Sequence, residues 1–199
     1  MLNRQQEYQK MSVVESNHWW YKTLHRLVLE SLKKYIPNRD SKILDAGCGS
    51  GGLMTFLNSY KYKNIKGFDL SNEALALSQE KNLEIMYGDI KDIESIISNQ
   101  HFDAIISNDT LYFLKSEEIS KFMFACSNGL RSGGVLILNI PVFNAFKGIH
   151  DVSVGIEKRF SRQSYKVFLS HQDFRVVRKI FWPFLLAPLI FLIRLVQRI

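Results

Sequence analysis

The chain has 199 residues, of which 46% are hydrophobic and 23% charged. This composition suits one folded domain with a substantial core and excludes an intrinsically disordered protein. The two cysteines, Cys48 and Cys126, lie far apart, which excludes a disulfide framework and a cysteine-based metal site. We therefore expect no metal and a cytoplasmic location. Residues 1–10 are polar and lack the apolar run of a secretory signal.

The net charge of +7 lies entirely in the C-terminal part of the chain. Residues 1–141 carry 16 Lys or Arg and 16 Asp or Glu, whereas residues 142–199 carry ten basic and three acidic residues. A basic flank beside an apolar stretch suggests an anionic membrane surface as readily as nucleic acid. We expect peripheral contact with the inner face of the membrane through residues 180–199, and no nucleic acid, because no RNA-binding module is visible. The alternative is a chance cluster of solvated basic side chains.

Apolar spacing predicts helices and strands that alternate along the chain. A cap by Ser71 or Asn72 starts the third helix, and Gly133 and Gly134 end the fifth. The predicted helices cover residues 24–36, 53–60, 71–81, 92–98, 119–130 and 161–170, and the predicted strands cover residues 43–44, 65–70, 83–87, 102–107, 135–140 and 174–181. Such alternation predicts an α/β, Rossmann-like, doubly wound and mostly parallel sheet with helices on both faces.

One structural domain with three parts is expected. Residues 1–40 form an N-terminal helical cap, residues 41–181 a cofactor-binding core, and residues 182–199 an apolar tail. Pro183 and Pro188 break the tail, which is too short for a membrane span.

The first strand ends in a glycine-rich turn, Asp-Ala-Gly-Cys-Gly-Ser-Gly-Gly at residues 45–52. Glycines let the backbone turn sharply and let a ligand approach closely, and the following helix offers free N–H groups. Gly47, Gly49 and Gly52 also meet the dinucleotide spacing, so a nicotinamide-dependent oxidoreductase is an alternative. Asp45 favours another ligand, because dinucleotide folds usually keep an apolar residue there and a carboxylate accepts from an amino group.

The turn and the strand ends after it resemble class I S-adenosylmethionine-dependent methyltransferases. Residues 43–51 resemble the first motif of that family, residues 102–108 its fourth-strand motif, and residues 130–137 its approach to strand five. The resemblance implies that Asp69 binds both ribose hydroxyls and that Asp89 accepts from the adenine amino group. The implied cofactor is S-adenosylmethionine, and the implied cofactor-binding residues are Asp45, Gly47, Cys48, Gly49, Asp69, Leu70, Asp89, Ile90 and Asn108.

Residues 15–21 resemble an N-terminal His-Trp-Trp signature in one bacterial branch of that family. We hypothesise that Trp19, Trp20 or Tyr21 closes over the cofactor or substrate pocket; the alternative is that they pack on the sheet edge. Tyr112 is also assigned to the substrate side, and it stands with Phe113 where the branch has Glu and His. This chain therefore has neither the acid nor the imidazole of the branch at these two positions.

Methyl transfer is an in-line displacement that depends mostly on positioning and desolvation. An oxygen nucleophile also has to lose its proton, and the candidate bases are His150 and Asp109. His150 matches the first of two histidines in the branch, but Ile156 stands in place of the second.

The sequence thus predicts methyl transfer from S-adenosylmethionine to an oxygen, less favourably to nitrogen or carbon, of a small or lipid-linked acceptor. The alternatives are a protein that binds S-adenosylmethionine without catalysis, and the oxidoreductase. The branch carries further chain that supplies the last strand, whereas this sequence stops at Ile199. We expect that strand to be missing or to be replaced by the tail.

Overall fold

A single parallel sheet organises the molecule. The computed structural model describes residues 18–98, 100–142, 159–161, 164, 166 and 173–182. Within them the strands are β1 (Ile43–Ala46), β2 (Ile65–Asp69), β3 (Ile85–Tyr87), β4 (Phe102–Asn108) and β5 (Leu130–Asn139). They pair in parallel in the order β3-β2-β1-β4-β5, so the strand order reverses between β1 and β4. The predicted parallel Rossmann-like sheet is confirmed, and ligands in such sheets bind at the carboxyl ends beside that reversal.

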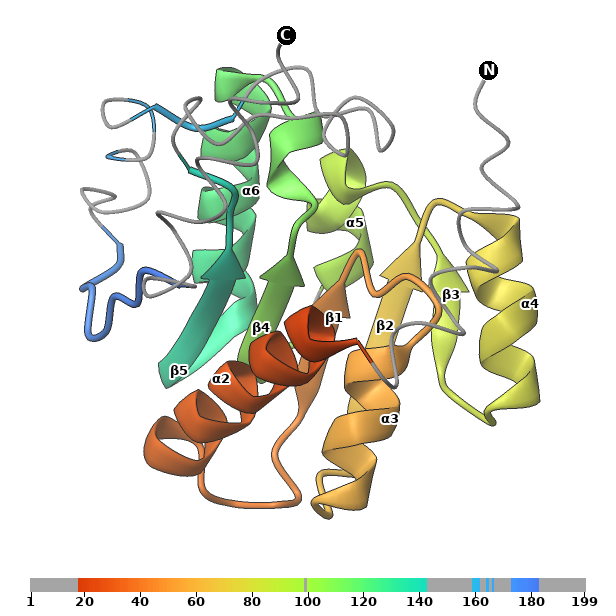
Figure 1. The fold of residues 1–199 in the computed structure, drawn as a ribbon. Helices are drawn as coiled ribbons and strands as arrows, with labels where there is room; N and C mark the ends of the chain where they lie inside the picture. The colour runs from red at the N-terminus through yellow and green to blue at the C-terminus, as the bar shows by residue number, and fades with distance from the viewer. Residues whose placement is uncertain are drawn as a thin grey trace, which may run out of the picture.

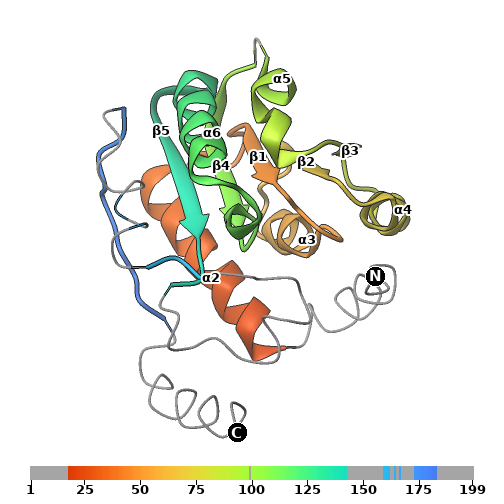
Figure 2. The same ribbon diagram turned by 90° about the horizontal axis from the view of Figure 1, so that it is seen from above.

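Helices cover both faces of the sheet. The helices are α2 (Trp19–Tyr35), α3 (Gly52–Ser59), α4 (Asn72–Glu80), α5 (Ile93–Ile97) and α6 (Ser116–Gly129), with two 3-10 turns, η1 (Ile90–Asp92) and η2 (Leu111–Phe113). Figure 1 shows α2 and α3 in front of the sheet and α5 and α6 behind it, and Figure 2 shows the same two layers from above. Ser71 caps α4, as predicted, because its side chain accepts from the amide of Ala74.

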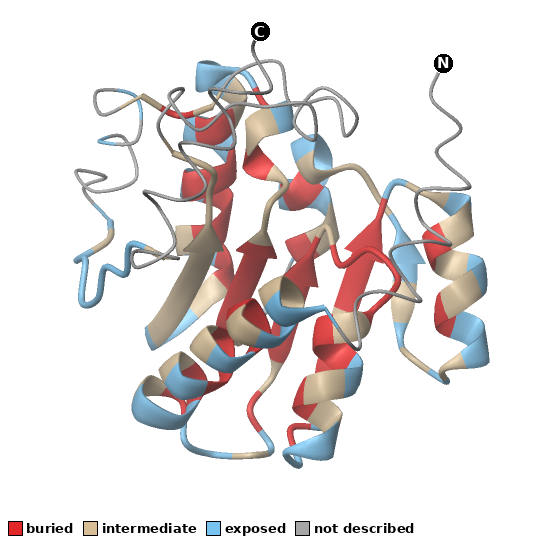
Figure 3. Cartoon of the chain, in the orientation of Figure 1, coloured by how far each residue is buried: buried red, intermediate tan, exposed pale blue. Residues whose placement is uncertain are grey.

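Alternation along the central strands divides the core into two apolar clusters. Ile43 and Ile106 face α2 and α3, whereas Leu44 and Ile105 face α5 and α6. The central strands are mostly buried, while β5 is exposed at residues 131–133 and half-buried over the rest of its length (Figure 3). Burial on both faces explains why these strands are continuous apolar runs rather than alternating ones.

The predicted end of the fifth helix, at Gly133 and Gly134, is wrong. α6 ends at Gly129, and β5 begins directly at Leu130. Leu130 pairs with Phe102 and Val135 pairs with Ala104, so the residues between them bulge out of the strand. Gly133 lies in this bulge with φ 79°. A glycine pair signals a left-handed backbone, but the pattern does not distinguish a helix end from a bulge.

The predicted strand at residues 174–181 is also wrong. This segment has no strand partner and instead follows α2. The Tyr35 hydroxyl donates to the Val177 carbonyl at 3.4 Å, and Arg178 reaches Glu30 at 3.2 Å. An apolar, β-branched pattern shows that a segment packs, but it does not say against what.

The predicted helix at residues 161–170 and the tail from residue 183 lie largely or wholly outside the described residues. No helix in the described part is long and apolar enough to cross a membrane.

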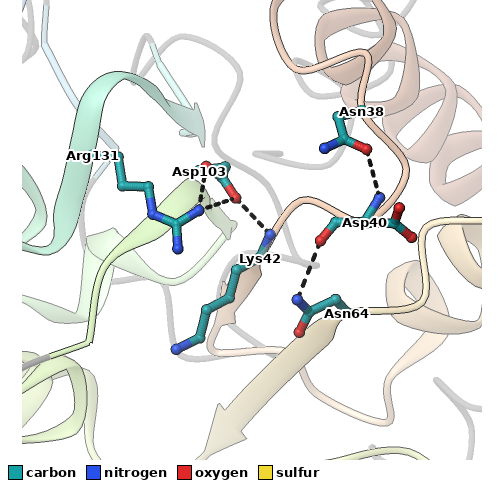
Figure 4. Close-up of polar contacts among 6 residues, drawn as sticks. All are labelled: Asn38, Asp40, Lys42, Asn64, Asp103 and Arg131. Carbon is teal, nitrogen blue, oxygen red and sulfur yellow. Dashed lines mark hydrogen bonds and ion pairs between the residues drawn. The ribbon is translucent and has the colours of Figure 1, made fainter.

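A polar cluster joins the amino ends of the central strands (Figure 4). The Asp103 carboxylate accepts from the Lys42 amide at 2.7 Å and from Arg131 Nη1 at 2.9 and 3.0 Å. Beside it, Asn64 donates to the Asp40 carbonyl at 3.3 Å. Asp103 therefore connects the start of β1, β4 and the bulge of β5.

Replacing Asp103 should test this connection. We expect Asp103→Ala to lower the free energy of unfolding in urea by about 1–3 kcal/mol, because the Lys42 amide and the Arg131 guanidinium both lose their acceptor. Asp103→Asn should cost less, since its amide oxygen still accepts from Lys42. The matched control is Glu84→Ala, which removes an ion pair with Lys66 at a 63% exposed carboxylate and should cost less than about 1 kcal/mol. Equal losses for Asp103→Ala and the control would contradict this account.

Candidate functional site

The glycine turn after β1 is held by the end of β2. The amides of Gly47 and Cys48 both donate to the Phe68 carbonyl at 3.0 Å. Gly47 has φ 76°, a conformation that glycine adopts without strain. A Cβ at Gly47 would lie 2.3 Å from the side chain of Thr110, so the loop after β4 approaches the turn closely.

Asp69 is the last residue of β2 and is 7% exposed. Its two carboxylate oxygens accept from the amides of Gly49 at 2.8 Å and Ser71 at 3.0 Å, one on each oxygen. An ionised carboxylate has about four acceptor positions, so Asp69 is suited to accept several hydrogen bonds. Leu70 follows directly and exposes 46% of its apolar surface at the same edge.

Other predicted residues lie on neighbouring strand ends. Asp45 is buried in β1. Asp89 caps η1 by accepting from the Lys91 amide at 3.0 Å, and Ile90 begins that turn. Asn108 ends β4, and its Oδ1 is buried with no hydrogen-bond partner in the part of the chain that the structure describes. A buried acceptor without a donor is costly, and a ligand that donates a hydrogen bond would relieve that cost.

The carboxyl edge therefore suits a ligand that is rich in donors. It combines carboxylates, an amide oxygen that no described residue satisfies, and a turn on which a Cβ has no room. S-adenosylmethionine offers an amino group, two ribose hydroxyls and an adenine amino group, so the residues present fit this cofactor. Within the described ranges, no group of His, Cys, Asp and Glu side chains is arranged to hold a metal ion.

Asp109 follows β4 and lies in a second polar cluster. Its backbone has φ 51°, and its amide donates to the Asn139 carbonyl at 3.0 Å. The Asn139 side chain donates to Asp109 Oδ1 at 2.8 Å, and the Trp20 indole also donates to this carboxylate. Burial raises the pKa of Asp109 to about 7, although the charge of Arg159 and the hydrogen bonds from Asn139 and Trp20 lower it.

Trp20 and Trp182 cover this cluster. Trp20 lies in the first turn of α2, and its ring centroid is 4.2 Å from that of Trp182. Trp182 Nε1 donates to Asn139 Oδ1 at 3.1 Å. We call Trp20, Asp109, Asn139 and Trp182 the Trp20–Asp109 cluster. Sequence reasoning missed Asn139, although its position at the carboxyl end of β5 was a signal, and missed Trp182, for which no local signal exists.

The other lid candidates lie elsewhere. Trp19 is 45% exposed, and the Tyr21 ring lies 6.3 Å from that of His25. Tyr112 lies in η2 and packs against the apolar cluster under α5 and α6. Among the four predicted aromatic residues, the structure brings Trp20 to Asp109. His150 lies outside the described residues.

Comparisons with known proteins decide the family. Residues 43–134 match a family profile described as a methyltransferase domain, a range that includes the glycine turn, Asp69 and Asp89. A crystal structure of an S-adenosylmethionine-dependent methyltransferase from Clostridium acetobutylicum is 27% identical, with a TM-score of 0.53, and covers 67% of this chain and 58% of that chain. Residues 43–134 thus form a methyltransferase domain of the class I S-adenosylmethionine-dependent kind. Its cofactor is S-adenosylmethionine, which excludes the nicotinamide alternative.

Curated methyltransferases show the same relationship. An uncharacterized methyltransferase of Staphylococcus carnosus is 27% identical and covers 62% of this chain and 58% of its own length. A ubiquinone biosynthesis O-methyltransferase of Xylella fastidiosa is 28% identical, with coverages of 68% and 59%. A phosphoethanolamine N-methyltransferase of Plasmodium falciparum is 26% identical, with coverages of 55% and 44%. The chain thus spans about half the length of these relatives.

A further crystal structure supports the fold alone. Magnesium protoporphyrin IX methyltransferase from Synechocystis, with bound S-adenosylhomocysteine, is 18% identical with a TM-score of 0.61. The match covers 79% of this chain and 75% of that chain. The class I methyltransferase fold therefore extends well beyond residues 43–134.

Two glycines with the same backbone conformation allow a matched test of the turn. Gly47→Ala and Gly133→Ala both place an alanine at a left-handed φ, which costs about 1–2 kcal/mol. Only Gly47→Ala also meets Thr110, because nothing lies within 4 Å of a Cβ at Gly133. We expect Gly47→Ala to weaken S-adenosylhomocysteine binding in calorimetry at least about tenfold and Gly133→Ala to leave it within about twofold. Equal affinities in the two variants would show that this close approach does not shape the site.

Proposed function

We propose that this chain transfers a methyl group from S-adenosylmethionine to an oxygen atom of a small or lipid-linked acceptor. The observation that carries the choice of oxygen is the carboxyl group of Asp109. This residue directly follows the carboxyl end of β4, and its pKa is about 7. A hydroxyl acceptor has to lose a proton, and a base with a pKa near the working pH is the most effective. A neutral amine attacks through its free lone pair and depends less on such a base.

We assign the cofactor to the carboxyl ends of β1 to β4. Asp69 would accept from the ribose hydroxyls, since a carboxylate can accept from two hydroxyls at once. Asp89 would accept from the adenine amino group and Asp45 from the amino group of the methionine part. Asn108 Oδ1, which has no partner among the described residues, would accept from a further donor. The exposed Leu70 would cover the adenine ring. The full set is Asp45, Gly47, Cys48, Gly49, Asp69, Leu70, Asp89, Ile90 and Asn108.

The bound cofactor supplies a methyl group on a positively charged sulfur, which is open to in-line displacement. Asp109 would take the proton of the acceptor hydroxyl, and Asn139 would keep its carboxylate in place. Trp20, stacked on Trp182, would exclude water from the same space, which is the lid role expected for it. His150, outside the described residues, is the second candidate base.

A protein that binds S-adenosylmethionine without catalysis is the alternative from another class. It would bind the cofactor through the same residues and would leave Asp109 without a proton to remove. Only turnover separates the two functions.

Cofactor binding tests the assignment of Asp69. We expect Asp69→Asn to weaken S-adenosylhomocysteine binding in calorimetry about 100-fold, because two charge-assisted hydrogen bonds become weaker neutral ones. The control is Asp92→Asn, which removes an exposed carboxylate from the same edge and should leave affinity within about twofold. Unchanged affinity in Asp69→Asn would remove this residue from the site.

Turnover tests the oxygen acceptor and the base. With methyl-labelled S-adenosylmethionine and a panel of phenols, aliphatic hydroxyls, lipid-linked hydroxyls and amines, we expect label on oxygen. Asp109→Asn should lower that rate about 100-fold or more, because it lacks the base. Label on nitrogen alone would contradict the oxygen acceptor, and no label on any acceptor would favour the non-catalytic alternative.

The pKa of Asp109 has a consequence for stability that needs no acceptor. Because its folded pKa is raised from 3.8 to about 7, the native state holds an extra proton between these values. The wild type should therefore lose stability relative to Asp109→Asn as pH rises from about 4 to about 7, and keep that full loss above pH 7.

Trp20→Phe sharpens this measurement. The indole donor of Trp20 lowers the pKa of Asp109, so its removal should raise that pKa further. The pH range over which stability falls should therefore extend to higher pH. The control is Trp19→Phe at a 45% exposed ring, which should leave this range unchanged. A parallel pH dependence of unfolding in wild type and Asp109→Asn would contradict the raised pKa.

A further inference from the structure

The extended segment at residues 173–182 has two different sides. Val177 and Phe181 are 52% and 53% exposed, whereas the residues just before them, Val176 and Ile180, are 38% and 41% exposed. This alternation, typical of an extended backbone, places the odd-numbered residues outermost. The outer row consists of Arg175, Val177, Lys179 and Phe181, in which basic and apolar side chains alternate.

The other side of the segment is fixed to the protein. Arg178 reaches Glu30 Oε2 at 3.2 Å and the Ser31 hydroxyl at 3.3 Å, both on α2. At the end of the segment, Trp182 donates to Asn139 and stacks on Trp20. These contacts hold the outer row in one orientation and join it to the Trp20–Asp109 cluster.

The neighbouring side of α2 adds positive charge. Around the α2 residues that contact the segment, the exposed basic residue is Lys34, and the exposed acid, Glu30, is paired with Arg178. Lys34 lies over the Tyr35 ring at 5.2 Å, and the Tyr35 hydroxyl donates to the Val177 carbonyl. Lys34 and Tyr35 therefore continue the outer row, and we call these residues together the α2–segment surface.

We propose that the α2–segment surface docks on an anionic lipid bilayer. Lysine and arginine side chains bind lipid phosphates, while Val177 and Phe181 reach the boundary between headgroups and acyl chains. A single-stranded RNA fits this surface less well. Proteins that bind single strands stack the bases on aromatic rings, whereas the side chain between the two cations of the outer row is the aliphatic Val177. This inference rests on the proposed lipid-linked acceptor, because Trp182 lies between the surface and Asp109 and docking would bring the site to the bilayer.

Co-sedimentation of the full chain with vesicles tests the proposal. The vesicles contain phosphatidylcholine alone or with 30 mol% phosphatidylglycerol. The test variant is Lys179→Glu with Phe181→Ser. Its matched control on the opposite face is Lys121→Glu with Phe124→Ser, since Phe124 on α6 is 52% exposed, close to the 53% of Phe181. S-adenosylhomocysteine binding is measured on the same samples.

We expect the wild type and the control to bind the anionic vesicles, and the test variant to bind them at least about tenfold more weakly, with cofactor affinity equal in all three. Binding should fall as salt is added. Equal vesicle binding by the test variant and the control overturns the proposal, as does wild-type binding that is independent of phosphatidylglycerol. If the test variant loses binding to a single-stranded RNA but binds vesicles as the wild type does, the surface is assigned to nucleic acid instead. Normal vesicle binding by a wild type that does not bind S-adenosylhomocysteine leaves this surface intact and contradicts the proposed function.

Discussion

The attachment of the glycine turn to the end of β2 is the constraint on which the site depends. One carbonyl, that of Phe68, accepts from two successive amides of the turn, and the next residue, Asp69, accepts from a third. These bonds hold the backbone of the glycine turn in a conformation that few residues other than glycine tolerate. They also bring the Asp69 carboxylate to the turn. Because β1 and β2 pair in parallel, both features lie at the same edge of the sheet.

The pairing of β4 with β5 has a comparable effect on the other side of the reversal in strand order. Asn108 and Asn139 are partners in this register, so the residue after β4 comes beside the end of β5. Asn139 uses both halves of its amide, donating to Asp109 and accepting from Trp182. One side chain therefore links the candidate base to a segment that follows it by more than forty residues in the chain.

What could be predicted from the sequence was local. The turn, Asp69 and the parallel sheet follow from short patterns, because each strand and the loop after it lie together in the chain. Gly133 was misinterpreted because a positive φ serves a helix end and a bulge equally. The contact of Trp182 with Asn139 had no pattern at all, since it depends on how a segment without strand partners packs against α2. Trp20 was expected to cover a pocket, and its proximity to Asp109 became visible only in three dimensions.

The two buried cysteines lie on opposite faces of the sheet. Cys48 belongs to the apolar cluster under α2 and α3, and Cys126 to the cluster under α5 and α6. Burial also raises the pKa of the Cys126 thiol, so this group is doubly protected from alkylation while α6 stays in place. Each layer of helices thus contains its own chemical reporter, and the rates at which the two thiols are alkylated would measure how often each layer opens, independently of the other.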